Sequence, residues 1–151
     1  MNYEINDDTL AIIPIDEYSS KVYEIDEEYI VDETPYSIME NSCKYFGSSL
    51  EGRIMGSKDV LGAIYKIPVI VEESQKLIFF PTKALDSPNV SWISYKNIKS
   101  IEKYNDKSLV KFKNDEKVIL DCPYFSLKNQ IFRCNMLDNI FYNRKGLKKD
   151  D

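Results

Sequence analysis

The stretch between residues 67 and 120 constrains the fold more strongly than any other part of the chain. It consists of short runs rich in β-branched and aromatic residues, separated by turn residues such as Asn105-Asp106 and Asn114-Asp115. Short runs of this composition between turns are typical of β-strands. The strands predicted here are 69–71, 77–80, 91–95, 98–104, 109–112 and 118–120.

Further elements are predicted on either side of this stretch. Residues 10–15 and 21–25 have the composition of strands, and residues 27–32 have that of a third, weaker strand. After the last strand, Ser126 is expected to cap a C-terminal helix, because the apolar residues behind it recur at helical spacing. The charged residues 144–151 should then form a frayed tail.

Two short helices are predicted ahead of residue 67. Thr34 followed by Pro35 is typical of a helix start, and Gly47 is placed to end that helix. Ser49 can cap a second helix by accepting a hydrogen bond from its first turn. Gly62 is expected to end this second helix.

Together these elements predict an α+β fold. We expect an antiparallel β-sheet built from residues 67–120 and closed by the C-terminal helix, with one or two short helices near residues 35–60. Five or six strands followed by one helix are also the order found in pleckstrin-homology-like barrels, so the sheet could be barrel-like. A length of 151 residues, 43% of them apolar, predicts a single domain spanning residues 1–151 with its own core.

The net charge of −5 hides a strong asymmetry along the chain. Residues 1–40 contain twelve acidic side chains and one basic one, whereas residues 41–151 contain nineteen basic and thirteen acidic ones. One interpretation is a body that faces nucleic acid and carries an acidic N-terminal segment that shields it. The other is an acidic face that only improves solubility. Charge alone leaves both open.

The composition also excludes several classes of function. The chain has no histidine, and its three cysteines lack C-x-x-C spacing. Serine-histidine and cysteine-histidine catalysis are therefore excluded, and a zinc site would lack ligands. We expect no enzyme activity, no metal and no cofactor. The absence of an 18-residue apolar run and of a signal-peptide start predicts a cytoplasmic protein without a membrane span.

The segment 42–53 is the strongest candidate for a binding site. It combines serines, glycines, aromatics and cations, and it includes the predicted start of the second helix. A helix N-terminus presents unsatisfied N–H groups and the positive end of the helix dipole, so it favours anions. The residues that could hold phosphate here are Lys44, Ser48, Ser49, Arg53 and Lys58. The alternative is that a serine only caps the helix and the cations are solvated.

Three further sets of residues have both a structural and a functional interpretation. Gly52 and Gly56 share one helix face and could allow close approach of another helix or of a phosphate. Four aromatic residues could pack in the core or stack on bases, namely Tyr45, Phe46, Phe79 and Phe80. Four lysines near the predicted strand 109–112 could form a solvated face or a phosphate track, namely Lys107, Lys111, Lys113 and Lys117.

Four motifs in register carry a family resemblance between residues 42 and 142. They are Ser42-Cys43-Lys44-Tyr45-Phe46-Gly47-Ser48-Ser49-Leu50-Glu51-Gly52-Arg53, the pair 68–71 and 78–82, Trp92-Ile93-Ser94, and Asn129-Gln130-Ile131-Phe132-Arg133. In this order and spacing, the chain resembles the ComK family. These are the transcription factors that switch on genetic competence in low-GC Gram-positive bacteria.

The resemblance implies a DNA-binding activator of DNA-uptake genes. It implies binding to paired A/T-rich boxes, largely through the minor groove, as a dimer or higher homo-oligomer on double-stranded DNA. Longer family members carry a tail behind the last helix that an adaptor uses to deliver them to a protease. This sequence stops soon after that helix, so regulation by an adaptor and protease is left open by the resemblance. The predicted DNA contacts are Lys44, Ser48, Ser49, Arg53, Lys58 and Arg133.

Two alternatives to an active DNA-binding factor remain open at this point. One is a pleckstrin-like module that binds a protein or a lipid headgroup and does not bind DNA. The other is a ComK paralogue that is inactive or antagonistic. Retardation of A/T-rich duplex with a steep salt dependence would separate the DNA binder from the module.

Overall fold

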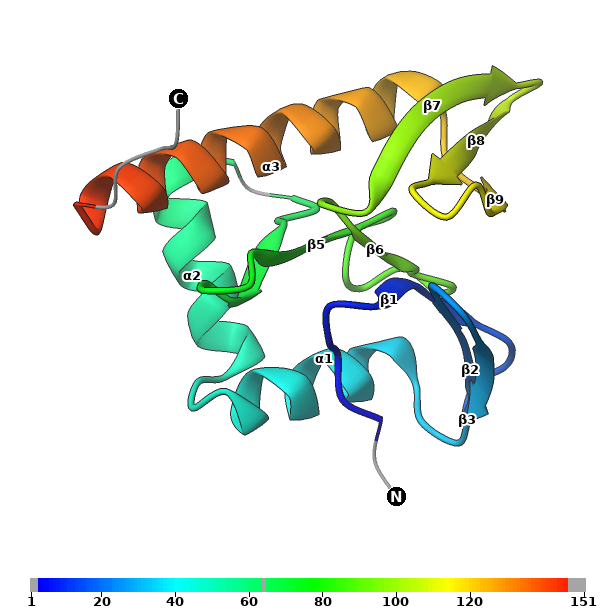
Figure 1. Ribbon diagram of the computed structural model, residues 1–151, viewed down its shortest axis with the longest axis horizontal. Helices are drawn as coiled ribbons and strands as arrows, with labels where there is room; N and C mark the ends of the chain where they lie inside the picture. The colour runs from blue at the N-terminus through cyan, green and yellow to red at the C-terminus, as the bar shows by residue number, and fades with distance from the viewer. Residues whose placement is uncertain (1–2, 64, 147–151) are drawn as a thin grey trace.

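The computed structural model describes residues 3–63 and 65–146 and confirms the α+β class. Within these residues, antiparallel strands are combined with helices, and a long helix ends the fold (Figure 1). In chain order the elements are β1 Thr9–Pro14, β2 Ser20–Glu24, β3 Glu28–Val31, α1 Pro35–Tyr45, α2 Leu50–Leu61, β4 Val69–Glu72, β5 Leu77–Pro81, β6 Trp92–Ser94, β7 Ile98–Tyr104, β8 Lys107–Phe112, β9 Lys117–Leu120 and α3 Tyr124–Arg144.

The strands form two sheets, so the prediction of one sheet from residues 67–120 is wrong. Six strands pair in the order β3-β2-β1-β6-β5-β4, and three pair in the order β7-β8-β9. The N-terminal strands join the larger sheet where β1 pairs with β6, with Ala11 opposite Ile93 and Ile12 opposite Trp92. Local patterns identify strands but contain no information about partners this distant in the chain. The sequence left a barrel-like sheet as a possibility, but neither sheet closes into a barrel.

Strands β4, β5 and β6 of the six-stranded sheet are buried on both faces, which explains their continuous apolar runs, whereas β3 at the other edge is largely exposed. Helix α1 lies along one side of the sheet and α3 along the other, with α2 running between them at one edge of the view (Figure 1). Phe79 packs on the α1 side in a cluster with Met39, whereas Phe80 faces the other cluster with Phe112 and Cys134. Phe79 and Phe80 are fully buried and belong to the core, so neither can stack on a base.

Local sequence signals position the two short helices as predicted. The Thr34 hydroxyl accepts a hydrogen bond from the Ser37 amide at 3.1 Å, and the Ser49 hydroxyl accepts one from the Gly52 amide at 3.0 Å. Gly62 ends α2 with a φ of 65°, in the left-handed region that favours glycine. These caps depend only on neighbouring residues, so sequence patterns are sufficient to find them.

The long helix α3 starts earlier than predicted. Pro123 is its N-cap, and the Leu127 amide donates to the Pro123 carbonyl at 3.1 Å. Ser126 therefore lies inside the first turn, and its predicted role as the cap is wrong. The fixed backbone of proline suits the start of a helix without a capping side chain. Arg144 still belongs to α3, so the predicted tail starts one residue later, and residues 147–151 of that tail lie outside the described residues.

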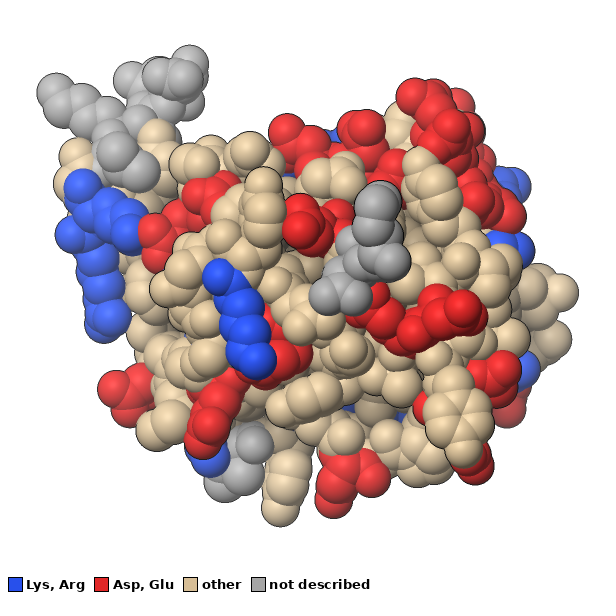
Figure 2. Space-filling view, turned by 90° about the horizontal axis from the view of Figure 1, so that it is seen from below, with Lys and Arg blue, Asp and Glu red and all other residues tan. Residues whose placement is uncertain are grey.

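The acidic N-terminal segment is built into the fold. Its residues form β1, β2 and β3, and Leu10, Ala11 and Ile12 are completely buried in the two core clusters. Figure 2 shows the molecule from the side on which α1 lies, and on this face patches of acidic side chains outnumber the basic ones. None of the helices in the described part of the chain has the length and hydrophobicity that a membrane span requires.

Candidate nucleic-acid interface

The motif at residues 42–53 folds into the junction between α1 and α2, and we call residues 44–58 the α1–α2 corner. Gly47 has a φ of 83°, and its amide donates to the Lys44 carbonyl at 2.9 Å. The Ser48 amide donates to the Cys43 carbonyl at 2.9 Å. This left-handed glycine reverses the chain directly behind α1, which explains why glycine stands between two helices here.

Ser49 is the N-cap of α2, as the sequence predicted. Its side chain accepts the Gly52 amide and its carbonyl accepts the Arg53 amide, both at 3.0 Å. Ser48 and Ser49 are both half-buried. The capping interpretation of Ser49 is therefore confirmed, and contact of either serine with a phosphate stays a prediction.

The glycines of α2 do not serve close packing within the described chain. A Cβ atom at Gly52 would lie 3.0 Å from the Ser49 side-chain oxygen, within the same helix turn. A Cβ atom at Gly56 would meet no described atom within 4 Å. The predicted close approach of another helix is therefore wrong, because this face of α2 is open. The alternative, approach to a phosphate, is still a prediction.

Cations and exposed apolar side chains alternate at the corner. The Lys44 side chain is 63% exposed, and its amine lies 3.6 Å from the Glu40 carboxylate one helical turn away. Lys58 is exposed, and the described residues offer it no ion pair. Tyr45 and Met55 are largely exposed beside them. The corner therefore offers exposed cations next to apolar surface, a combination suited to a polyanion with stacked bases.

Arg53 is held within the fold by a carboxylate. Its guanidinium donates to the Glu73 carboxylate at 3.0 Å, and the Arg53 side chain is only 25% exposed. Glu73 also binds Lys145, which follows α3. The hydrogen bond from Lys145, supported by the one from Arg53, lowers the pKa of Glu73 below its ordinary value. The Arg53 Nε atom is buried and has no hydrogen-bond partner among the described residues.

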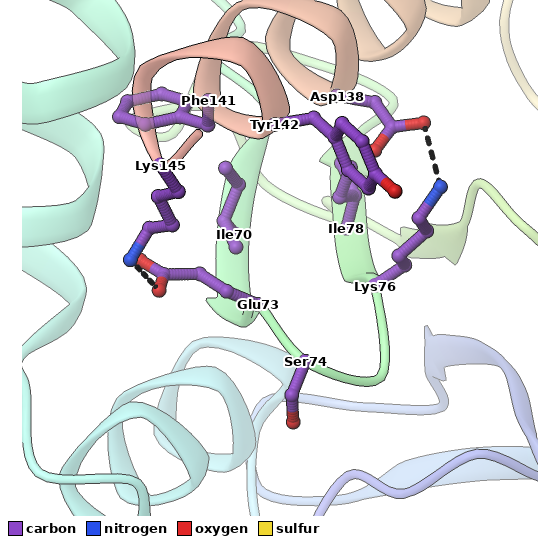
Figure 3. Close-up of a pocket in the computed structure, with 9 residues that line it drawn as sticks. All are labelled: Ile70, Glu73, Ser74, Lys76, Ile78, Asp138, Phe141, Tyr142 and Lys145. Carbon is purple, nitrogen blue, oxygen red and sulfur yellow. Dashed lines mark hydrogen bonds and ion pairs between the residues drawn. The ribbon is translucent and has the colours of Figure 1, made fainter. Parts of the chain in front are cut away.

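The carboxylate of Glu73 also borders a small hollow between the β4–β5 hairpin and the end of α3. Figure 3 shows Glu73 with Lys145 on one side of it and Lys76 with Asp138 on the other. The Lys76 amine lies 3.5 Å from the Asp138 carboxylate. The hollow has a volume of about 90 Å³, and its apolar lining residues are Ile70, Ile78 and Phe141. Because Glu73 binds both Arg53 and Lys145, it connects α2, the hairpin and the end of α3.

Arg133 lies on α3 and supports the loop that leads into β4. Its guanidinium donates to the Tyr65 carbonyl at 2.8 Å, and to the Lys66 carbonyl and the Gln130 side chain at 3.3 Å each. Gln130 is buried and donates to the carbonyls of Lys66 and Pro81 at 2.8 Å. Sequence reasoning missed Gln130, although a polar residue within an apolar helical stripe is a signal of such a role.

The cysteines and carboxylates provide no chemistry beyond packing in the described structure. Cys43, Cys122 and Cys134 are buried free thiols. Burial raises the pKa of Cys43 to about 11, although the charge of Arg53 opposes this shift. Among the described residues, no group of three or more cysteines and carboxylates could hold a metal ion.

Comparisons with known proteins agree with the motifs at the corner and beyond it. The family model described as ComK protein matches residues 1–146. The competence transcription factor of Bacillus subtilis strain 168 is 34% identical over 147 residues, which cover 95% of this chain and 77% of that protein. No solved structure matches this chain. With a match over nearly its whole length and this level of identity, the chain belongs to the ComK family.

Proposed function

We propose that this chain is a DNA-binding transcription factor that activates competence genes. The observation that carries the proposal is the match over residues 1–146 to the ComK family, together with a relative named as a competence transcription factor. The described strands form two open sheets, and no observation on them favours the pleckstrin-like alternative. The protein would act in the cytoplasm, where its target promoters are accessible.

The proposed target is A/T-rich duplex DNA, read largely through the minor groove. The minor groove distinguishes A·T from G·C pairs by its width and by few donors, so its readers need a small number of inserted cations and many phosphate contacts. The longest helix, α3, buries Leu127, Cys134 and Leu137 against the sheets. One face of α3 therefore belongs to the core, and the proposal does not use α3 as a recognition helix in the major groove.

At the α1–α2 corner, we assign different roles to the predicted contacts. Lys44 and Lys58 would bind phosphates directly, beside Ser48 and Ser49 at the start of α2. Arg53 would reach DNA only after leaving Glu73, so a phosphate or a groove must compete with that carboxylate. Arg133 would act indirectly, because its donors already bind the loop ahead of β4.

Assembly and turnover complete the proposal. Paired boxes suit a homo-oligomer on DNA, because two identical subunits read two identical half-sites. Regulation by an adaptor that delivers the protein to a protease is proposed from the family alone. An inactive or antagonistic paralogue would bind the same DNA without activating transcription, so a promoter reporter in cells separates it from an activator.

Binding of the full chain to A/T-rich and G/C-rich duplexes of equal length, titrated over a range of salt concentrations, tests the proposal. We expect tighter binding to the A/T-rich duplex and a linear fall of log affinity with log salt. The double variant Lys44→Ala/Arg53→Ala should reduce that slope by about one unit for each cation that neutralises a phosphate. Lys128→Ala, an exposed lysine on α3, is the matched control. Failure to bind either duplex would overturn the proposed function.

A further inference from the structure

The small sheet β7-β8-β9 has one face in the core and one face toward solvent. Ser108, Val110 and Phe112 of β8 are completely buried, so the alternating residues of this strand point away from the core. Lys107, Lys111 and Lys117 lie on the outer side, and we call this surface, with Leu109 and Ile119, the lysine face.

The lysine face places like charges directly opposite each other. Lys111 and Lys117 are cross-strand partners on β8 and β9, so their amines extend from the same side of the sheet. Like charges in this position destabilise a sheet unless something neutralises them. Asp115 binds Lys111 at 3.6 Å but also binds Lys99 at 3.0 Å. Within the described structure, no carboxylate lies within ion-pair distance of Lys107 or Lys117.

The same face also exposes large apolar side chains. Ile119 is 48% exposed and lies opposite Leu109, while Tyr104 is 47% exposed and lies opposite Lys107. The acidic residue among the cross-strand partners of these side chains is Glu102, which lies opposite Leu109. The face therefore offers apolar contact surface between its lysines, in addition to their positive charge.

Further lysines extend the lysine face toward α3. Lys113 follows the end of β8 and lines a hollow of about 330 Å³ together with Lys96 and Lys76. Lys76 is paired with Asp138 and Lys96 with Asp7, so Lys113 is the amine of this hollow for which the described residues offer no ion pair. Lys107, Lys111 and Lys113 therefore follow one another at alternate positions along β8 and past its end.

We propose that the lysine face is a second contact surface for the phosphate backbone of duplex DNA. This inference rests on the proposed function, in which the chain binds DNA. Along β8, Lys107 and Lys111 are separated by about 13 Å, from the rise of a strand. One strand of duplex DNA carries a phosphate about every 3.4 Å of helix axis, so these lysines can face several phosphates in succession. The charge of the face is complementary to that ligand, whereas the face in Figure 2 is acidic and would repel it.

The α1–α2 corner and the lysine face lie at opposite ends of the molecule (Figure 1). A long, continuous polyanion can contact surfaces this far apart, and a small anion cannot. Duplex DNA therefore fits the pair of surfaces better than a free phosphate or a single headgroup does. Each surface should contribute its own share of the salt dependence of binding.

Substitution of Lys117 gives a test with two opposite readouts. Lys117→Glu would place opposite charges across β8 and β9, so the thermal midpoint should rise by about 1–3 °C. The same variant should bind A/T-rich duplex more weakly, and the log–log salt slope should shrink by about one unit. The neutral double variant Lys111→Gln/Lys117→Gln should shrink the slope by about two units. Lys128→Glu on α3 controls for the change in net charge.

The outcomes separate this inference from the proposed function. If the unmodified chain binds no duplex, both fail together. If it binds, but Lys117→Glu and Lys128→Glu weaken binding equally and the double variant keeps the full slope, the lysine face does not contact DNA while the proposed function stands. Poly-glutamate as a competing probe covers the remaining case. Binding of poly-glutamate that the double variant abolishes, with DNA binding intact, would assign the face to an acidic protein and overturn the DNA assignment.

Discussion

The α1–α2 corner and the lysine face differ in how their cations are neutralised. At the corner, Lys44 has Glu40 nearby, and Arg53 is bound to Glu73. On the lysine face, Lys111 shares one carboxylate with another lysine, and Lys117 has none among the described residues. The corner contains the longest of the motifs that resemble the ComK family, yet the Arg53 guanidinium there is already paired with Glu73. A cation in such a motif is therefore available to a ligand only if no carboxylate close to it in the folded structure already binds it.

This difference also changes how each region should respond to substitution. Corner residues such as Gly47 and Ser49 determine the path of the chain, so their loss acts first on stability. Exposed lysines on a sheet contribute little to folding, so their loss acts first on binding. Measurements of unfolding free energy alongside DNA affinity can therefore assign each residue to one role or the other.

The largest effect on stability is expected for Arg133→Ala. This change removes a charged donor from the carbonyls of Tyr65 and Lys66, so the free energy of unfolding should fall by about 2 kcal/mol in urea titrations. The folded variant should bind DNA as the unmodified chain does. Lys128→Ala on the same helix is the control. Loss of DNA binding with unchanged stability would instead make Arg133 a direct contact.

A smaller effect is expected for Ser49, where two substitutions can be compared. Ser49→Ala removes the acceptor for the Gly52 amide and should destabilise the protein by about 1 kcal/mol. Ser49→Gly should cost only a few tenths of a kcal/mol, because glycine leaves the amide open to water. If the hydroxyl also contacts phosphate, both variants should weaken DNA binding equally. If it only caps the helix, both should bind normally once folded.

The smallest effect on stability, but an informative one for binding, is expected for Glu73→Gln. Loss of the carboxylate charge should release Arg53 toward DNA and raise affinity by about twofold to fivefold, since a partly exposed ion pair contributes less than about 1 kcal/mol. Glu17→Gln, an exposed acid in the turn between β1 and β2, controls for net charge. Equal affinity gains in both variants would show that Arg53 does not reach DNA.

The pH dependence of the unfolding free energy, measured without DNA, tests the role of the Glu73 carboxylate. The pKa of Glu73 is lowered in the folded protein, so its contribution to stability is present above the ordinary glutamate pKa and is lost as the pH falls through the folded pKa. The difference in unfolding free energy between the unmodified chain and Glu73→Gln should therefore become smaller as the pH falls through this range. A difference that stays constant with pH would show that Glu73 acts through packing and not through its charge.

Most secondary structure was predictable because its signals are local. Thr34-Pro35, Gly47, Ser49 and Gly62 place the limits of α1 and α2 through contacts within a few residues. The one cap that failed, Ser126, lies behind a proline that begins the helix earlier. The strands were also predictable, but the division into two sheets was not, because the pairing of β1 with β6 joins residues about eighty positions apart.

The candidate site was only partly predictable, for a related reason. The sequence placed Lys44, Ser49 and Arg53 at a helix junction, and the structure brings them together there. The sequence contained no sign that Arg53 would bind Glu73, which lies twenty residues after it. Gln130 was missed although it interrupts an apolar stripe, a signal that marks a buried amide serving loop carbonyls.

By itself, the sequence determined the α+β class, the caps of α1 and α2, the charge asymmetry and the family to which the chain belongs. These depend on residue order and on neighbours along the chain. Only the tertiary structure decided which strands share a sheet, that Glu73 holds Arg53, and that Lys111 and Lys117 oppose each other across two strands. Electrostatic neutralisation and burial depend on distance in space, and residues distant in sequence become neighbours only when the chain folds.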